Sequence, residues 1–275
     1  MPAKVRLGVS DATYLRPLLF GLNAEDSPFE LSFDYPAVNS VHLNERTKGL
    51  RCAFLSPIDY ARHGGLYRIV PQVCVSSTQA TGAVTLTVKR DVRNIRKVAV
   101  DVRVTSEIVL AKIVLLERFR NVPEERSEIQ FIPMMPSLET MLQKADAALL
   151  VNLSAAKSPV TEHHTLDLVE EWSDLTGLPY VHGFWVAREE DFGEDYVRSL
   201  IDARDRGVSH MDAVVSNSAQ SNVPQEQLAT YFESFSYDFG QDEIDAVEEF
   251  MKFAYYHGVL GDVPELSFFD HFASS

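Results

Sequence analysis

Apolar residues along this chain fall into alternating short runs and longer periodic stretches, which predict strands and helices in turn. Compact apolar runs at Val5–Val9, Phe29–Phe33 and 52–55 have the length and composition of strands. Segments 17–22 and 38–46, which lie between these runs, are expected to be helices. Strands that alternate with helices predict an α/β protein.

The clearest local signal is a helical pattern that runs directly into a continuous apolar segment. Apolar residues recur at helical spacing from Leu168 to Leu175, Gly177 follows where a helix normally ends, and Pro179 prevents continuation. Tyr180–Ala187 is apolar almost throughout, which is the pattern of a strand covered on both faces. A helix followed by a buried strand is therefore expected.

Elsewhere the expected elements follow the same principles. Residues 66–88 are rich in β-forming side chains, and further strands are expected at 98–104 and 145–151. A long helix is expected at 105–119, and the chain beyond residue 190 is expected to be mainly helical.

The length favours two lobes, because single cores stop growing near about 250 to 300 residues and the chain has 275. We expect it to pass between the lobes near Gly82 and again near Ala187. Residues 1–82 and 188–275 then form one discontinuous lobe, and residues 83–187 form a second, inserted lobe. Hinged lobes of this kind hold their ligand in the cleft between them.

Composition and charge exclude several classes of protein. Apolar residues make up 45% of the chain and charged residues 24%, as in an ordinary globular protein. The 25 Lys and Arg against 40 Asp and Glu give a net charge of −15, which disfavours nucleic acid and anionic lipid as partners. We expect a cytoplasmic protein, since neither a signal peptide nor a membrane span is evident.

Cofactor and metal motifs are not evident in the sequence. Cys52 and Cys74 lie in apolar runs and are expected to be small buried hydrophobic residues. The eight histidines have no metal-binding spacing, and there is no glycine-rich phosphate loop, so we expect neither a metal nor a cofactor.

The loop after the first strand carries the first candidate site residues, Asp11, Thr13, Tyr14 and Arg16. In an open α/β sheet such a loop is a usual ligand position. Asp11 is the nearest carboxylate that could act as a base, and the Tyr14 phenol could donate a proton or a hydrogen bond. The alternative is that Asp11 caps a turn and Tyr14 packs its ring.

Hydroxyl groups at expected helix starts are the second set. Thr105 and Ser106 open the long helix, and Ser56 precedes a proline that can begin another. Free amides and the helix dipole favour an anion at such positions, although ordinary N-capping is the alternative.

Three further polar residues complete the candidates. Ser77 lies near the expected first crossing, Asn152 follows a strand and either binds a ligand or forms a turn, and His182 lies on the expected crossing strand.

Several of these stretches resemble the menaquinone-biosynthesis family of the futalosine pathway, which contains chorismate dehydratase. The similarity is carried by Pro17 and Leu18, by Thr105 and Ser106 where the family has Ser-Arg-Thr-Ser, and by 145–151, Ala-Asp-Ala-Ala-Leu-Leu-Val. The resemblance implies a two-lobed fold like that of type II periplasmic binding proteins, with a mixed sheet flanked by helices in each lobe. It also implies dehydration of chorismate without a cofactor.

Three positions depart from the family pattern. Tyr14 replaces an asparagine, Leu86 replaces a serine, and Asn152 with Leu153 replaces Gly-Asp. Three hypotheses therefore stay open: a chorismate dehydratase-like lyase, a divergent lyase for another carboxylate, or a non-catalytic cytoplasmic binding protein for a small aromatic or cyclic carboxylate. A monomer or homodimer is expected. The lyase hypothesis gives proton transfer to Asp11 and Tyr14, and substrate binding to Thr13, Arg16, Ser56, Ser77, Thr105, Ser106, Asn152 and His182.

Overall fold

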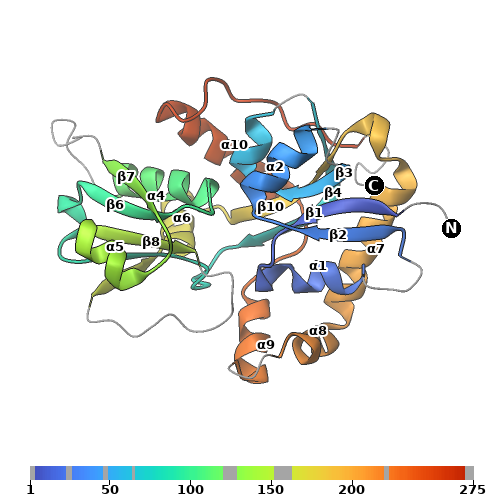
Figure 1. Ribbon diagram of the computed structural model, residues 1–275, viewed down its shortest axis with the longest axis horizontal. Helices are drawn as coiled ribbons and strands as arrows, with labels where there is room; N and C mark the ends of the chain where they lie inside the picture. The colour runs from blue at the N-terminus through green and yellow to red at the C-terminus, as the bar shows by residue number, and fades with distance from the viewer. Residues whose placement is uncertain are drawn as a thin grey trace.

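The protein has two lobes, each built on a five-stranded mixed sheet flanked by helices (Figure 1). This is the predicted fold class. The computed structural model describes residues 4–22, 27–45, 49–63, 66–119, 129–151, 163–219 and 223–269.

The first sheet has the strand order β2-β1-β3-β10-β4. The two neighbours of β1 are parallel to it, whereas β10 is antiparallel to both β3 and β4. Its strands are β1 (Val5–Val9), β2 (Phe29–Phe33), β3 (Leu50–Leu55), β4 (Arg68–Ser77) and β10 (Tyr180–Ala187). The α-helices of the first lobe are α1 (Arg16–Phe20), α2 (Pro36–Asn44), α3 (Pro57–Ala61), α7 (Glu194–Ser209), α8 (Met211–Ser218), α9 (Gln225–Glu233) and α10 (Gln241–Tyr256).

The second sheet has the order β7-β6-β8-β5-β9. Its central strand β8 pairs in parallel with β6 and antiparallel with β5. Its elements are β5 (Val84–Val88), β6 (Lys97–Asp101), α4 (Ser106–Glu117), β7 (Gln130–Met134), α5 (Leu138–Lys144), β8 (Ala147–Val151), β9 (His164–Asp167) and α6 (Leu168–Thr176).

The local signals at the end of α6 are confirmed. Gly177 adopts the left-handed conformation that ends the helix, with φ of 73°, and the indole N–H of Trp172 donates to the Pro179 carbonyl at 2.9 Å. All eight residues of β10 are buried because this strand lies inside the sheet. Cys52 and Cys74 are also buried, with free thiols.

The position of β10 corrects the expected lobe boundary at residue 187. Its pairing with β3 and β4 puts residues 180–187 in the first sheet, so the chain returns from the second sheet before Tyr180. A fully apolar strand has the same sequence pattern in the centre of either sheet, and only its partners distinguish the two. The outward passage lies between Ser77 and Val84.

Asp167 ties the two passages together. One of its carboxylate oxygens caps α6 by accepting from the amide of Val169 at 2.9 Å. The other accepts from the amides of Thr81 and Gly82, at 3.0 and 2.6 Å. One side chain thus fixes the start of the returning helix against the outgoing segment.

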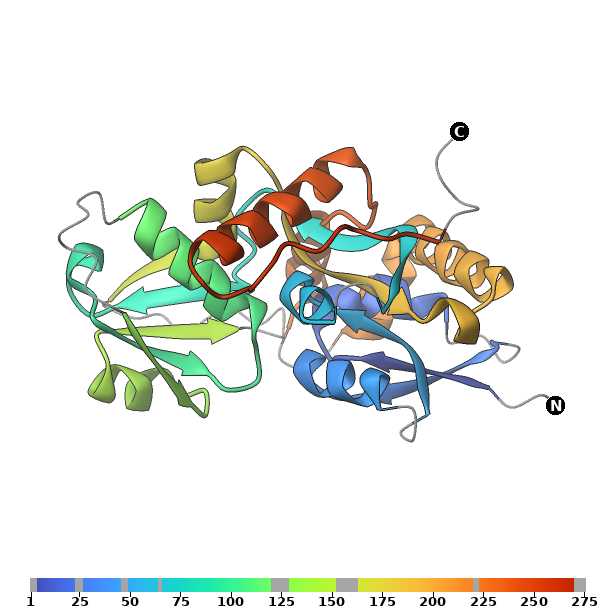
Figure 2. The same ribbon diagram turned by 90° about the horizontal axis from the view of Figure 1, so that it is seen from above.

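A second link between the lobes comes from the end of α10. Figure 2 shows this helix, in red, lying across the two lobes before the chain turns back over the first lobe. At its end, the His257 carbonyl accepts from the Lys112 ammonium at 2.8 Å, and the His257 imidazole lies 2.9 Å from the Glu117 carboxylate. Both partners belong to α4 of the second lobe.

Candidate active site at the lobe junction

The loop after β1 separates its predicted site residues into two environments. Asp11 and Arg16 pair with each other, and their side chains are 71% and 36% exposed. Thr13 and Tyr14 form a short 3-10 turn, in which Tyr14 is buried. Burial raises the pKa of the Tyr14 phenol well above its ordinary value, so its hydroxyl stays protonated. Only Tyr14 of this group reaches the interior.

The predicted hydroxyl groups at helix starts converge on a carboxylate of the protein itself. The Thr105 hydroxyl donates to both carboxylate oxygens of Asp59 at 3.0 Å, and the Ser56 hydroxyl donates to one of them at 2.7 Å. Ser106 accepts from the Ile58 amide at 3.2 Å. The starts of α3 and α4 are thereby joined across the lobes, and the anion bound there is the side chain of Asp59.

Glu107, in the first turn of α4, is the important residue that sequence analysis missed. Its side chain is buried, and burial raises its pKa to about 7, helped by the nearby carboxylates of Asp59 and Asp101. Backbone hydrogen bonds from Thr105 and Glu107 itself oppose this rise. The signal that could have revealed it is a single carboxylate in an otherwise apolar helix start. At neutral pH this carboxyl group is balanced between its two protonation states.

The first lobe contains an aromatic cluster, which we define as Tyr14, Tyr180, His182, Tyr231 and Phe235. The His182 ring centroid lies 5.1 Å from that of Tyr14, 5.0 Å from Tyr180 and 5.4 Å from Phe235. Phe235 also contacts Tyr231, at 5.0 Å. The cluster combines the β1 loop, strand β10 and the region around the end of α9.

Three polar atoms of the aromatic cluster are buried without a hydrogen-bond partner in the described part of the chain. They are the Tyr180 hydroxyl oxygen, the Tyr231 hydroxyl oxygen and His182 Nε2. Burial lowers the pKa of His182 to about 3, so its imidazole is neutral at physiological pH. Burial raises the pKa of Tyr14 and of Tyr180, and the nearby Glu107 carboxylate raises both further. The buried carboxyl group is therefore near enough to act electrostatically on the phenols of Tyr14 and Tyr180.

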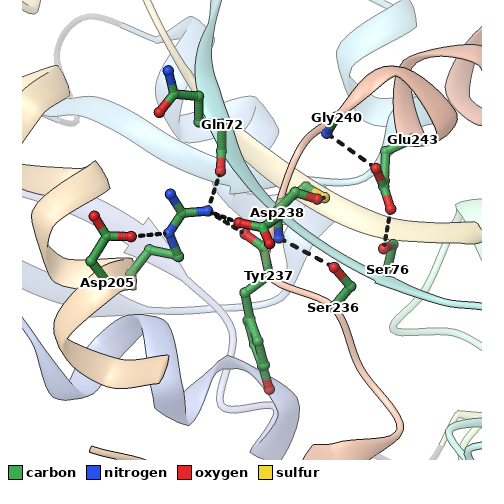
Figure 3. A network of polar contacts seen from close by, with 10 residues as sticks. Gln72, Ser76, Asp205, Ser236, Tyr237, Asp238, Gly240 and Glu243 are labelled. Atoms are coloured by element: carbon green, nitrogen blue, oxygen red, sulfur yellow. Dashed lines mark hydrogen bonds and ion pairs between the residues drawn. The ribbon is translucent and has the colours of Figure 1, made fainter. Parts of the chain in front are cut away.

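A network of hydrogen bonds and ion pairs in the first lobe includes Gln72, Asp205 and Asp238 (Figure 3). Arg204 of α7 donates to the Gln72 carbonyl at 2.7 Å and pairs with Asp238 (Figure 3). Gln72 has an unusual positive φ of 64°. Next to Asp238, the Tyr237 hydroxyl donates to the Tyr14 carbonyl at 3.1 Å. The segment that carries Phe235 is thus fastened to both β4 and the β1 loop.

The remaining predicted site residues have other positions. Ser77 is buried at the end of β4 and donates to the Ser234 carbonyl at 2.6 Å, so its hydroxyl is used in packing the segment after α9. Asn152 lies outside the described residues. Leu86 is buried within β5.

Within the described ranges, we find no group of three or more His, Cys, Asp or Glu side chains arranged to hold a metal ion. A search of the same residues for a helix long and apolar enough to span a membrane finds none.

Solved structures with the periplasmic-binding-protein fold match nearly the whole chain. Protein AF1704 from Archaeoglobus fulgidus is 14% identical with a TM-score of 0.68, over 94% of this chain and 99% of that one. The Candida albicans CA3427 gene product, described as having the generic periplasmic binding protein fold, is 12% identical with a TM-score of 0.64, over 100% and 99%. The alkanesulfonate-binding protein SsuA from Xanthomonas axonopodis pv. citri, bound to MOPS, is 13% identical with a TM-score of 0.61, over 96% of each chain. The protein therefore has the fold of the periplasmic binding proteins.

The family is defined by the sequence itself. Residues 5–256 match the family described as menaquinone biosynthesis, which is nearly the whole chain. This protein belongs to the menaquinone biosynthesis family.

Proposed function

We propose that this protein is a carbon–oxygen lyase that removes water from chorismate, with Glu107 as the group that transfers the proton. The observation that carries this function is a carboxyl group, buried at the lobe junction of a menaquinone biosynthesis family member, whose pKa is raised to about 7. A carboxyl group with a pKa near the working pH can both accept and return a proton.

The chemistry of chorismate suits a single proton-transfer group. The enolpyruvyl ether oxygen and the hydroxyl are trans substituents on neighbouring ring carbons. The hydrogen on the ether-bearing carbon and the hydroxyl, which are both lost, therefore lie on the same face of the ring. Ionised Glu107 takes the ring hydrogen as a proton, and the C–H electron pair becomes a ring double bond. As the C–O bond breaks, the hydroxyl takes the proton from Glu107 and leaves as water. The ring becomes aromatic, an enolpyruvyl-substituted benzoate forms, and Glu107 returns to its ionised state.

The other residues support this step in different ways. Tyr14, whose hydroxyl stays protonated, acts as a hydrogen-bond donor beside Glu107 and not as a base. Asp11 receives no catalytic role because it is exposed and paired with Arg16. Arg16 is two residues from Tyr14 in the sequence. When the substrate binds, the Arg16 guanidinium leaves its ion pair with Asp11 and pairs with a substrate carboxylate.

The direct test is incubation of the purified protein with chorismate, followed by mass spectrometry for loss of one water and by ultraviolet absorbance for the aromatic product. Turnover should fall by about a hundredfold to ten-thousandfold in Glu107→Gln and persist in Glu139→Gln, which changes an exposed glutamate in the first turn of α5. Full turnover in Glu107→Gln would refute its role. In Arg16→Gln, KM should rise while kcat changes little.

A second candidate function is ligand binding without turnover. It is favoured by the hydrogen bonds that commit Thr105 and Ser56 to Asp59, since these hydroxyls are not free for a substrate carboxylate. A binding protein would show a thermal shift with chorismate, about 2.7 kcal/mol of added stability at 100 times the dissociation constant, and no product. Tyr14→Asn, which restores the family residue, would then be the variant in which to look for turnover.

A further inference from the structure

The unpaired polar atoms of the aromatic cluster point to a ligand that hydrogen-bonds them. Buried polar groups in folded proteins almost always have partners, because an unpaired group loses its hydration and gains nothing. Here Tyr180, His182 and Tyr231 leave three such atoms in one aromatic cluster, in which Tyr180 contacts His182 and Phe235 joins His182 to Tyr231. The Ser77 hydroxyl, by contrast, lies nearby and is fully used.

The electrostatic character of the cluster limits the kind of group it can accept. His182 and Tyr231 have pKa values shifted by burial alone, while those of Tyr14 and Tyr180 are shifted by burial and by carboxylates or phenols. None of these shifts has a lysine or arginine of the described residues as a cause. A carboxylate here would be buried beside Glu107 without a positive partner, which is strongly unfavourable. An uncharged hydroxyl group would pair with phenol and imidazole, which both donate or accept.

The shape of the cluster favours a ring. Tyr14, Tyr180 and Phe235 surround the His182 imidazole with centroid distances of 5.0 to 5.4 Å, so the unpaired atoms are set among flat apolar surfaces. Aromatic side chains contact a six-membered ring with large area and little loss of side-chain freedom.

We propose that Tyr180, His182 and Tyr231 form a subsite for the hydroxyl-bearing edge of a six-membered ring acid, and that the carboxylate of this ligand lies outside the aromatic cluster. This inference rests on the proposed function for the reaction, and it adds the orientation of the substrate. The departing hydroxyl points into the cluster, toward Glu107, and Tyr180, His182 and Tyr231 are specificity-determining residues.

The test uses two stable ring acids that differ in their hydroxyl groups, shikimate and cyclohexene-1-carboxylate. Their binding is measured by calorimetry on the full-length protein and on Tyr180→Phe, Tyr231→Phe and the double variant. Shikimate should bind the native protein at least about tenfold more tightly, since two hydrogen bonds of ordinary strength supply this ratio. In the double variant, which keeps the His182 nitrogen, the preference for shikimate should fall to about threefold or less.

Tyr67→Phe is the matched control. The Tyr67 hydroxyl is also buried without a partner in the described residues, but Tyr67 lies under Arg188, with the guanidinium 5.3 Å from its ring centroid. This variant should keep the native preference for shikimate. His182→Phe, which keeps a flat ring and removes the nitrogen, should lower the preference by about threefold.

Two outcomes would overturn the subsite. One is equal or undetectable binding of both acids by the native protein, and the other is an unchanged preference in the double variant. Chorismate turnover is measured separately on the same preparations. Turnover without any preference removes the subsite and leaves the lyase function, whereas preference without turnover removes the lyase function and leaves the subsite.

Discussion

Two polar regions of this molecule, the Arg204 network and the lobe junction, differ in whether their buried polar groups have hydrogen-bond partners. Around Arg204, the guanidinium donates to the Gln72 carbonyl and to the carboxylates of Asp205 and Asp238. At the junction, Tyr180, His182 and Tyr231 keep unpaired atoms among the described residues. A satisfied network stabilises the fold, while an unsatisfied one lowers stability and is retained where a ligand completes it. The difference supports a structural role for the first region and the proposed ligand-binding role for the second.

Among the variants that test this comparison, Glu107→Gln at the lobe junction is expected to have the largest effect. The amide cannot transfer a proton, so kcat for chorismate should fall by about a hundredfold to ten-thousandfold. Steady-state kinetics on native protein and on Glu139→Gln provide the reference values. In the native protein, kcat/KM should decrease as the pH falls below about 7, because the ionised carboxylate begins the reaction.

Arg204→Ala tests the structural region. Removal of the guanidinium deletes its buried hydrogen bond to the Gln72 carbonyl, so the free energy of unfolding in urea should fall by about 2–4 kcal/mol. Arg206→Ala, on the exposed face of the same helix, should change it by less than about 0.5 kcal/mol. The two partner carboxylates are largely exposed, so the lost carbonyl hydrogen bond is expected to dominate. Equal stability of the two variants would contradict the distinction between the regions.

The pH dependence of stability sharpens the comparison further. The pKa of Glu107 is raised from an ordinary value of 4.5 to about 7, so between these pH values the folded protein holds a proton that the unfolded chain has lost. Stability from this group is therefore complete below about pH 4.5 and is lost as the pH rises through about 7, by at most about 3 kcal/mol. Glu107→Gln should be more stable than native protein at pH 8 by up to this amount, as measured by urea unfolding at several pH values. Asp59 and Asp167 are present in both proteins, so the difference isolates Glu107.

Tyr180→Phe should have the smallest effect. Its hydroxyl has no partner in the described residues, so removal should leave the free energy of unfolding unchanged or raise it by up to about 1 kcal/mol. Thermal unfolding without ligand measures this change. A loss of more than about 1 kcal/mol would mean that the hydroxyl has a structural partner.

The sequence was most informative where structure depends on neighbouring residues. The end of α6 at Gly177 and the buried strand after Pro179 follow from helix capping and apolar pattern, and both are confirmed. The lobe to which that strand belongs depends on its pairing with β3 and β4, which are distant in sequence. Local patterns do not contain this information.

The candidate site follows the same rule. Tyr14 and His182 were expected near the cleft from their positions in the β1 loop and on the strand, and their rings are in contact. Glu107 was missed because an acidic residue in the first turn of a helix is ordinarily solvated and favoured by the dipole. Its burial arises from the approach of α3 to α4, seen in the hydrogen bond between Thr105 and Asp59, which are 46 positions apart.

Ser77 and Tyr180, the last residue of β4 and the first of β10, face each other as a register pair on adjacent strands. The entire inserted lobe therefore departs and rejoins through a gap only about 5 Å wide. All five strands of the first sheet lie outside residues 78–179. With respect to that sheet, residues 78–179 therefore form a long connection between two paired antiparallel strands, β4 and β10. A short turn in its place would leave that sheet continuous.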